Sequence, residues 1–275
     1  MNYEVELVGK IGSMALIDKE NNDIDYNLIK RLSKELKPGY VWVSSGATEI
    51  GRLDYIKRFG CELTGNYENI KTDYAACGQP ILMSCYRKYI SNKYSIKQVL
   101  VEHQHFNDEA KRRHLTDMLL RCKAQNAIPV INYNDAVSDE ENRKMEISSL
   151  IKEKGKAVEC VDNDETASQI ACLLKSRLLV ILTSVDGIYI NPKDPSSLIT
   201  KISGQNAGEL ISNIELHKGY CEGASRLGAN GAKAKLEYIK EPVIAGTKVI
   251  IANAKYSLKE IISGKVRCTT VGIDN

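Results

Sequence analysis

Three polar residues, Asp162, Asn163 and Asp164, precede an apolar run of helical character, Ser168–Leu174. A carboxylate or amide at a helix start can accept hydrogen bonds from the free backbone N–H groups of the first turn. Helix capping is therefore the simplest interpretation of these residues. The second hypothesis is that Asp164 organises a catalytic centre, and other segments of the chain decide between the two.

One such segment, Gly9–Ser13, places Lys10 between two glycines at the end of the first apolar stretch. Glycine allows backbone N–H groups to approach a phosphate, and the ammonium adds positive charge. The segment lacks the lead-in of a Walker P-loop and the spacing of the GxGxxG fingerprint. By itself the segment is more typical of an ordinary turn than of an anion site.

Two further loops have anion-binding character. Gly228–Leu236 is a glycine-containing loop that opens a helix, so its N–H groups could hold phosphates while Lys233 or Lys235 reaches in. Ser44–Ala47 is a turn of small residues before another helix. The alternatives are an exposed loop for Gly228–Leu236 and a helix cap for Ser44–Ala47.

The elements that would position these loops alternate between strands and helices. Strands are expected at Tyr3–Leu7, Ser13–Ile17, Tyr40–Val43, Ile96–Val101, Ala127–Asn132, Leu178–Thr183 and Thr247–Ala252. Helices are expected at Tyr26–Leu36, Tyr74–Tyr89, Arg113–Gln125, Thr166–Leu174, Ala232–Glu241 and Leu258–Ile262.

This alternation predicts an α/β fold, a three-layer α/β/α sandwich with a mostly parallel central sheet. Ligands bind such sheets beyond the carboxyl ends of the strands. Ser44–Ala47, Asn132–Asp135 and Thr183–Asp186 each follow a strand and should gather at that edge. Ser138–Cys160 interrupts the alternation, and we expect a hairpin or lid there, or a surface loop without a role.

Composition excludes several classes of protein. The net charge of +3 comes without a basic stripe, so nucleic acid is not an expected partner. No apolar run approaches the roughly 20 residues of a membrane span, and the N-terminus lacks signal-peptide character, so we expect a cytoplasmic protein without a membrane partner. The eight cysteines form no CxxC pair, and His103 and His105 have no carboxylate motif nearby, so no metal site is expected.

Taken together, the motifs resemble the amino acid kinase family, and within it the bacterial glutamate 5-kinases. The matching stretches run in family order over nearly the whole chain: VGKIGS (8–13), VSSGA (43–47), GQPILM (78–83), IPVINYNDAV (128–137), VDNDETAS (161–168), ILTSVDGIY (181–189), GANGAKAKL (228–236) and VIIAN (249–253). The chain ends at Asn275, so we expect it to lack the RNA-binding-like C-terminal PUA domain that many glutamate 5-kinases carry.

The resemblance implies roles for particular residues. Lys10 and Lys235 take the places of the two catalytic lysines, and Asp164 that of the aspartate that holds them. The implied substrate-binding residues are Ser45, Gly46, Asp135 and Asn163. The implied ATP-binding residues are Lys10, Gly12, Thr183, Ser184, Ala229, Asn230, Gly231, Ala232, Lys233, Ala234 and Lys235.

The resemblance also implies ATP, with Mg²⁺ carried on it, and L-glutamate as acceptor, which would give L-glutamyl 5-phosphate, the first step of proline biosynthesis. It implies a homo-oligomer, a dimer or tetramer, of a single-domain chain. The acceptor-substrate lobe would span about 1–165 and the ATP lobe about 166–275. Two alternatives stay open: a family member acting on aspartate, UMP or isopentenyl phosphate, and a catalytically silent nucleotide-binding module.

Four features depart from the family pattern. Glu49 stands where an apolar or small residue is usual, Asn230 replaces a glycine, Gly9 replaces an apolar strand residue, and Ser138–Cys160 is longer than its counterpart. None of them removes Lys10, Asp164 or Lys235. They therefore bear on the acceptor more than on phosphoryl transfer.

Overall fold

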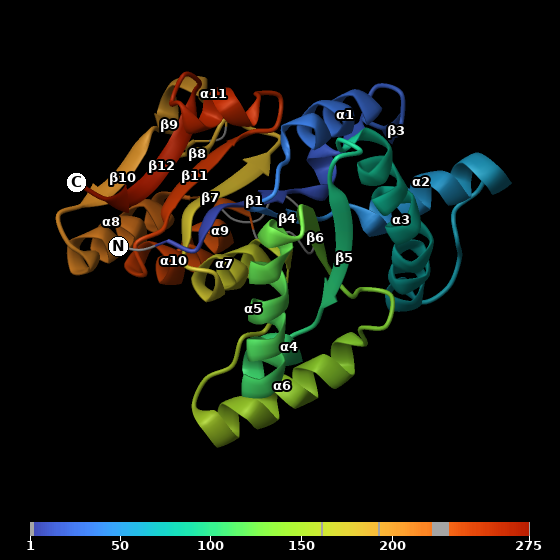
Figure 1. Ribbon diagram of the computed structural model, residues 1–275, viewed down its shortest axis with the longest axis horizontal. Helices are drawn as coiled ribbons and strands as arrows, with labels where there is room; N and C mark the ends of the chain where they lie inside the picture. The colour runs from blue at the N-terminus through green and yellow to red at the C-terminus, as the bar shows by residue number, and fades with distance from the viewer. Residues whose placement is uncertain (1–2, 161, 192, 222–230, 275) are drawn as a thin grey trace. The chain divides into compact units, whose positions relative to one another are not determined.

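The structure is a computed structural model of residues 1–275, of which residues 3–160, 162–191, 193–221 and 231–274 are described (Figure 1). The chain divides into two compact units. Unit 1 comprises Met1–Gly12, Gly39–Val43 and Asp164–Asn275, and unit 2 comprises Ser13–Pro38 and Ser44–Asn163.

Unit 1 is built on a sheet of mostly parallel strands. The strand order is β10 (Lys201–Gly204), β12 (Cys268–Ile273), β11 (Lys248–Asn253), β7 (Ser176–Thr183), β1 (Val5–Ile11) and β4 (Tyr40–Ser44). The pairs β1–β7, β7–β11 and β10–β12 are parallel, while β11–β12 is antiparallel. Lys10 is in register with Ile181, which is in register with Ile251.

Helices flank this sheet. They are α7 (Asn163–Leu173), α8 (Ala207–Tyr220), α9 (Gly231–Tyr238), α10 (Lys240–Ile244) and α11 (Leu258–Ile262). Helix α8 packs on β10, and α10 packs on β11 and β12. A small hairpin, β8 (Ile188–Tyr189) and β9 (Leu198–Ile199), and a 3₁₀ turn, Pro195–Ser197, complete the described part of the unit. The predicted mostly parallel α/β fold is confirmed.

Trp42 explains one departure from the family pattern. Its side chain is fully buried, and a Cβ atom built on Gly9 would lie only 2.2 Å from the indole ring. A side chain at position 9 and this indole therefore cannot occupy the same space. Glycine in β1 is the consequence of a tryptophan in β4.

Unit 2 contains the parallel pair β5 (Ser95–Val101) and β6 (Ala127–Tyr133). Its helices are α1 (Tyr26–Glu35), α2 (Ala47–Phe59), α3 (Tyr67–Tyr89), α4 (Gln104–Asn107), α5 (Glu109–Ala124) and α6 (Glu140–Lys154). A 3₁₀ turn, Ser13–Ala15, and the short pair β2 (Ile17–Asp18) and β3 (Asp23–Ile24) precede α1.

Two glycines allow α2 and α3 to pack backbone against backbone. A Cβ on Gly51 would lie 1.8 Å from the carbonyl oxygen of Tyr74, and one on Gly78 would lie 1.8 Å from that of Ala47. Any side chain at either position would force the helices apart. The contact fixes α2 at its N-terminal end, where the Ser44–Ala47 turn enters the helix.

Two sequence predictions about elements were wrong. The predicted strand Ser13–Ile17 is a 3₁₀ turn followed by β2. Ser138–Cys160 is not a hairpin but contains helix α6: Asp139 accepts a hydrogen bond from the backbone N–H of Asn142, and Gly155 ends the helix in the left-handed region at φ 76°. In α6 only Ile147 is buried, so the segment has little of the apolar periodicity from which helices are recognised.

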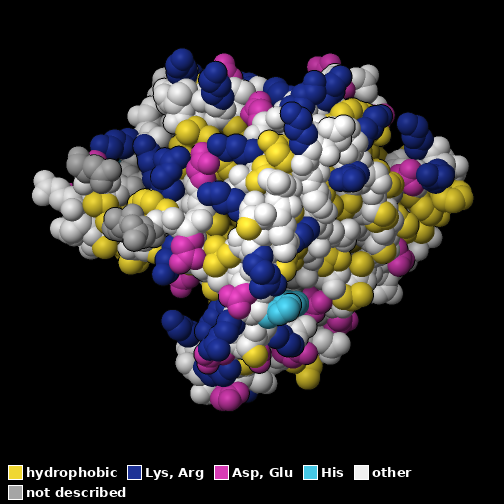
Figure 2. Space-filling model, in the orientation of Figure 1, with side chains coloured by type: hydrophobic (Ala, Val, Ile, Leu, Met, Phe, Trp, Pro, Cys, Tyr) yellow, Lys and Arg dark blue, Asp and Glu magenta, His cyan; other side chains and the backbone are white. Residues whose placement is uncertain are grey.

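The surface has no single sign of charge. On the face in Figure 2, basic and acidic side chains are interspersed, in keeping with the net charge of +3. Within the described ranges, no helix is long and apolar enough to cross a membrane.

Candidate functional site

Three charged residues from separate parts of the sequence meet in unit 1. Lys10 Nζ lies 2.6 Å from Asp164 Oδ1, and Lys235 Nζ lies 2.9 Å from Asp164 Oδ2. The carboxylate thus holds one ammonium on each oxygen. Lys10 and Asp164 are buried, with 6% and 5% of their surfaces exposed, whereas the Lys235 side chain keeps 20% of its surface in solvent.

Each residue is fixed by a different element. Lys10 comes from the carboxyl-terminal half of β1, Asp164 from the first turn of α7 and Lys235 from the second turn of α9. A carboxylate in the first turn is stabilised by the partial positive charge at the helix N-terminus. The capping and catalytic hypotheses for Asp164 are therefore compatible, because the helix start and the lysines both favour its ionised form.

The charge state of Asp164 follows from these contacts. Burial raises the pKa of its carboxyl, but the charges and hydrogen bonds of Lys10 and Lys235 outweigh burial and lower the pKa from 3.8 to about 2. At neutral pH the cluster is an ionised carboxylate between two lysines. Its cations are held in place and can donate to a further anion.

Predicted nucleotide-binding residues lie near this cluster in unit 1. A Cβ on Gly12 would be 3.8 Å from Lys10 Nζ, and the Gly12 N–H donates to the carbonyl of Leu182 at 3.1 Å. Thr183 ends β7, where its hydroxyl accepts from the Val185 N–H at 2.9 Å. The carbonyl of Ser184 accepts from the Asn253 amide at 3.2 Å. The carboxyl ends of β1, β7 and β11 therefore come together here.

The remaining predicted nucleotide residues belong to the start of α9. Gly231 begins the helix with φ 58°, followed by Ala232, an exposed Lys233, and Ala234. Ala229 and Asn230 lie outside the described residues, so the departure at Asn230 stays a sequence observation.

The predicted acceptor-binding residues lie in unit 2. Ser45 and Gly46 lead into α2, and Gly46 adopts φ 108°, a conformation that favours glycine. The preceding Ser44 is buried, with its hydroxyl 2.9 Å from the hydroxyl of Tyr86 in α3. This anchor holds the end of β4 so that the turn keeps its shape.

Asn163 belongs to a buried set of amides that sequence reasoning missed. Its amide donates to Asn132 Oδ1 at 2.8 Å, and its own Oδ1 accepts from the Tyr133 N–H at 3.2 Å. Asn132 in turn donates to Gln79 Oε1 at 2.8 Å. Each bond fixes which end of an amide is oxygen, so Asn163 is held in one orientation.

A signal for Asn132 was present in the sequence, but none for Gln79. Asn132 interrupts an apolar strand whose residues are all buried, and a buried amide needs hydrogen-bond partners. The sequence showed the need but not the partner, because Gln79 comes from α3, far away along the chain.

Asp135 lies in the turn after β6. Burial raises the pKa of its carboxyl, while the positive charges of Lys71 and Arg143 act in the opposite direction. Arg143 comes from α6, the helix inside the Ser138–Cys160 segment, so the long segment supplies a charge to the surroundings of Asp135.

Glu49 is engaged by a neighbour. Its carboxylate forms an ion pair with Arg52 at 2.9 Å, and Arg52 also reaches Glu62 at 2.5 Å. Hydrogen bonding to Glu49 raises the pKa of the Arg52 guanidinium. The negative charge of Glu49 is therefore partly compensated by Arg52, which it shares with Glu62.

The predicted absence of a protein-held metal remains a prediction. His103 Nε2 lies 2.7 Å from Glu146, and His105 Nδ1 accepts from the Glu102 N–H at 3.0 Å. Within the described part of the chain, no group of three or more potential metal ligands is found.

A mostly parallel α/β sheet and two lysines on one buried carboxylate, a cluster of net charge +1, are features suited to binding an anion. The chain belongs to the amino acid kinase family, whose model matches residues 6–253. That membership identifies it as a phosphotransferase at the level of the family.

Curated relatives are similar over most of this chain. A glutamate 5-kinase of Alkaliphilus metalliredigens is 29% identical and covers 98% of this chain and 96% of its own length. A Delta-1-pyrroline-5-carboxylate synthase of Mesembryanthemum crystallinum is 30% identical over 90% of the chain, and a glutamate 5-kinase of Streptococcus suis 29% over 92%. The chain spans 32% and 65% of the lengths of these two relatives.

Solved structures share the fold. A carbamate kinase from Giardia lamblia bound to AMP-PNP aligns with a TM-score of 0.58 at 16% identity, covering 98% of both chains. A UMP kinase from Bacillus anthracis aligns with a TM-score of 0.55 at 14% identity, covering 100% of this chain and 97% of that one.

Proposed function

We propose that this protein transfers the γ-phosphoryl group of ATP to a carboxylate, and that the acceptor is the γ-carboxylate of L-glutamate. The observation that carries the proposal is the pair of lysines held on one buried carboxylate, Lys10 and Lys235 on Asp164. The choice of acceptor rests on the similarity to relatives named glutamate 5-kinase.

The chemistry requires positioning and charge more than proton transfer. A carboxylate oxygen of the acceptor forms a bond to the γ-phosphorus while the bond from that phosphorus to the ADP oxygen breaks, giving ADP and an acyl phosphate. The acceptor is already ionised at neutral pH, so no general base is needed. This agrees with a role for Asp164 as a positioning residue, since its low pKa makes it a poor proton acceptor.

The two lysines would act on the phosphoryl group. Fixed ammoniums stabilise the charge on its oxygens without reorganising during the reaction, which favours the transition state. Mg²⁺ would arrive bound to ATP and neutralise phosphate charge.

In unit 2, the acceptor would meet a different set of groups. The turn at Ser45 and Gly46 offers a hydroxyl and backbone N–H groups suited to a carboxylate. Within the described part of the chain, one of the two amide hydrogens of Asn163 bonds to Asn132, and the other would donate to the acceptor. Asp135 would pair with the α-ammonium group of an amino acid. Burial raises the pKa of Asp135, and the positive charge of the ligand would offset this effect.

The test measures ADP release with Mg-ATP and a panel of acceptors: L-glutamate, L-aspartate, UMP and isopentenyl phosphate. Hydroxylamine in the assay converts an acyl phosphate to a hydroxamate and so distinguishes carboxylate from phosphate acceptors. We expect hydroxamate with L-glutamate. ADP release with UMP or isopentenyl phosphate alone would show that the acceptor is a phosphate and not L-glutamate. Tight nucleotide binding without turnover would show that the protein is a silent binding module and not an enzyme.

Variants connect this activity to the site. Lys10→Met and Lys235→Met should each lower kcat by a factor on the order of 10² to 10³, the usual effect of removing one group that stabilises transition-state charge. Lys93→Met is the matched control, because Lys93 is an exposed lysine in the turn before β5. Equal kcat values for all three variants would show that Lys10 and Lys235 do not contribute to phosphoryl transfer.

A further inference from the structure

Helix α9, Gly231–Tyr238, carries Lys235 but contributes little to the core. Leu236 is the one buried residue among its eight. A short helix is fixed mainly by the packing of an apolar face, so α9 needs further contacts to keep Lys235 in one place. Such contacts lie between α9, α10 and α8, which pack together in unit 1 (Figure 1).

Two ion pairs join the α9–α10 segment to α8. Glu237 of α9 pairs with Lys218 of α8, and Lys240 of α10 pairs with Glu215 of α8. Lys240 also pairs with Glu237 at 2.6 Å, and Lys218 also pairs with Glu215 at 3.5 Å. The four residues therefore form a closed set of alternating charges, which we call the charge ring.

The two lysines of the charge ring are the better shielded members. The side chain of Lys240 is 18% exposed and that of Lys218 is 27% exposed. Burial acts to lower the pKa of Lys240, but its hydrogen bonds to Glu215 and Glu237 outweigh burial and raise the pKa. An isolated surface ion pair contributes little, whereas several charges in one network can maintain a defined geometry. The charge ring can therefore fix α9 against α8.

Lys235 and Glu237 point in different directions from α9. Residues two apart in a helix are separated by about 200° around its axis. Lys235 reaches Asp164 at 2.9 Å, whereas Glu237 reaches the other members of the charge ring. Lys10, Asp164 and Lys235, the lysine–aspartate cluster, thus contact one side of α9 and the charge ring contacts the other. Loss of the ring would release one of these two sides.

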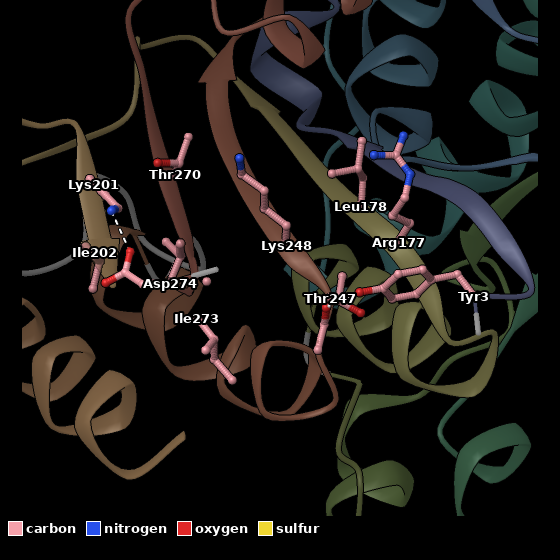
Figure 3. Close-up of a pocket in the computed structure, with 13 residues that line it drawn as sticks. Tyr3, Arg177, Leu178, Lys201, Ile202, Thr247, Lys248, Thr270, Ile273 and Asp274 are labelled. Carbon is pink, nitrogen blue, oxygen red and sulfur yellow. Dashed lines mark hydrogen bonds and ion pairs between the residues drawn. The ribbon is translucent and has the colours of Figure 1, made fainter. Parts of the chain in front are cut away.

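Helix α10 is itself anchored in unit 1. Glu241, next to Lys240, accepts a hydrogen bond at 2.8 Å from the amide of Gln169 in α7, the helix that carries the aspartate of the cluster. After α10, the hydroxyl of Thr247 donates to the carbonyl of Ser176 in β7 at 2.8 Å. Figure 3 shows Thr247 beside Tyr3, at the cavity that both residues line. The charge ring therefore links α9 to a helix that is fixed to both α7 and the sheet.

We propose that Glu237 and Lys240 are positioning residues, which fix α9 through the charge ring and thereby keep the Lys235 ammonium on Asp164. They act through the helix and not by contact with the phosphoryl group. The inference rests on the proposed function for the role of Lys235 in catalysis. The placement of Lys235 can nevertheless be measured without any turnover.

The first test measures how well Lys235 is shielded in the full chain. The protein is treated with a limiting amount of acetic anhydride, and mass spectrometry compares acetylation of Lys235 with that of the exposed Lys265. An ammonium held against a buried carboxylate is protected until the helix opens locally. We expect Glu237→Gln and Lys240→Met each to raise the relative acetylation of Lys235 about threefold or more.

Two control variants calibrate this measurement. Asp164→Asn removes the carboxylate that holds Lys235, so it should raise acetylation of Lys235 directly. Glu109→Gln removes an exposed ion pair with Arg113 in α5 of unit 2, and it should leave acetylation of Lys235 unchanged. Circular dichroism verifies that each variant keeps its fold.

The second test is kinetic. At saturating ATP we expect Glu237→Gln to lower kcat about fivefold or more, because a misplaced catalytic group costs rate, with the KM for the acceptor within about twofold of wild type. Lys240→Met should behave in the same way. The double variant should be little slower than either single variant, because both substitutions open the same ring.

Each outcome decides one question. Unchanged acetylation of Lys235 in both Glu237→Gln and Lys240→Met would overturn the inference. Raised acetylation with an unchanged kcat would also overturn it, since the ring would then not serve phosphoryl transfer. Raised acetylation in a protein that turns over none of the acceptors would contradict the proposed function and support the placement of Lys235 by the charge ring.

Discussion

Replacing Asp164 by asparagine removes one charge with little change in shape, and the structure predicts the consequences. The variant leaves Lys10, which is 6% exposed, without its counter-ion, while Lys235, whose side chain is 20% exposed, can turn toward solvent. Removing one partner of a buried ion pair is strongly destabilising because a buried charge is left uncompensated.

The magnitude follows from the pKa of Asp164. A pKa lowered from 3.8 to about 2 means that ionisation of this group stabilises the folded state by about 2 kcal/mol at neutral pH. Because the folded-state pKa is the lower one, this contribution is present above pH ~4 and disappears as the pH falls toward 2. At pH ~3 roughly half of it should remain.

Urea unfolding followed by tryptophan fluorescence can measure this. Trp42 is the single tryptophan and is fully buried in β4, so its emission reports on unit 1, where Asp164 lies. We expect Asp164→Asn to lower the free energy of unfolding by about 2 kcal/mol at pH 7, with the difference from wild type narrowing below pH ~4. A difference that is absent at pH 7, or that stays constant down to pH 3, would refute the ion-pair reasoning.

Catalysis gives a second readout of the same variant. If Asp164 positions both lysines, Asp164→Asn should lower kcat about 10²-fold or more. The effects of Lys10→Met and Asp164→Asn should be far from additive in the double variant, because both substitutions disable the same lysine–aspartate cluster. Additive losses would mean that Asp164 acts independently of the lysines.

Three further perturbations test particular contacts. Gln79→Leu removes the oxygen that accepts a hydrogen bond from the buried amide of Asn132, so we expect the free energy of unfolding to fall by about 1–3 kcal/mol. We also expect a raised KM for the acceptor substrate and an unchanged KM for ATP. A raised KM for ATP would contradict the assignment. Gly9→Ala should lower the free energy of unfolding by about 1–3 kcal/mol, because the new methyl group would clash with the Trp42 ring. In the Trp42→Val background, with unfolding followed by circular dichroism, most of this loss should disappear. Strictly additive losses for the two substitutions would rule out the clash. Glu49→Ala should leave the KM for L-glutamate within about twofold, because an arginine in the same helix already partly compensates its charge, and a tenfold fall in KM would place the carboxylate against the acceptor.

The fold was predictable from local signals where those signals are strong. Apolar strands such as Leu178–Thr183, and amphipathic helices such as α1, are set by residues close together in sequence, and both lie within two residues of the predicted bounds. Helix α6 was missed because it buries a single residue, Ile147, so that its caps at Asp139 and Gly155 were its main signal.

The site residues show where sequence reasoning ends. Lys10, Asp164 and Lys235 could each be singled out by type and by resemblance, but their distances depend on the pairing of β1 with β7 and on the placement of α7 and α9. Gln79 could not be assigned, because a glutamine in a helix is ordinarily a solvated residue until its partner is known. Gly9 shows the same limit, since its small size has a reason only once Trp42 is seen beside it.

The departures from the family pattern occur in both units, and Gly9 belongs to unit 1. Glu49 and Ser138–Cys160 belong to unit 2, which also holds Asp135 and the amides around Asn163, whereas the lysine–aspartate cluster lies wholly in unit 1. Asn163 and Asp164 are adjacent in sequence, and the boundary between the units falls between them. We therefore expect substitutions around Asp135 and Asn163 to change which acceptor is used without changing the rate of phosphoryl transfer. Substitutions at the lysine–aspartate cluster should lower that rate without changing the choice of acceptor.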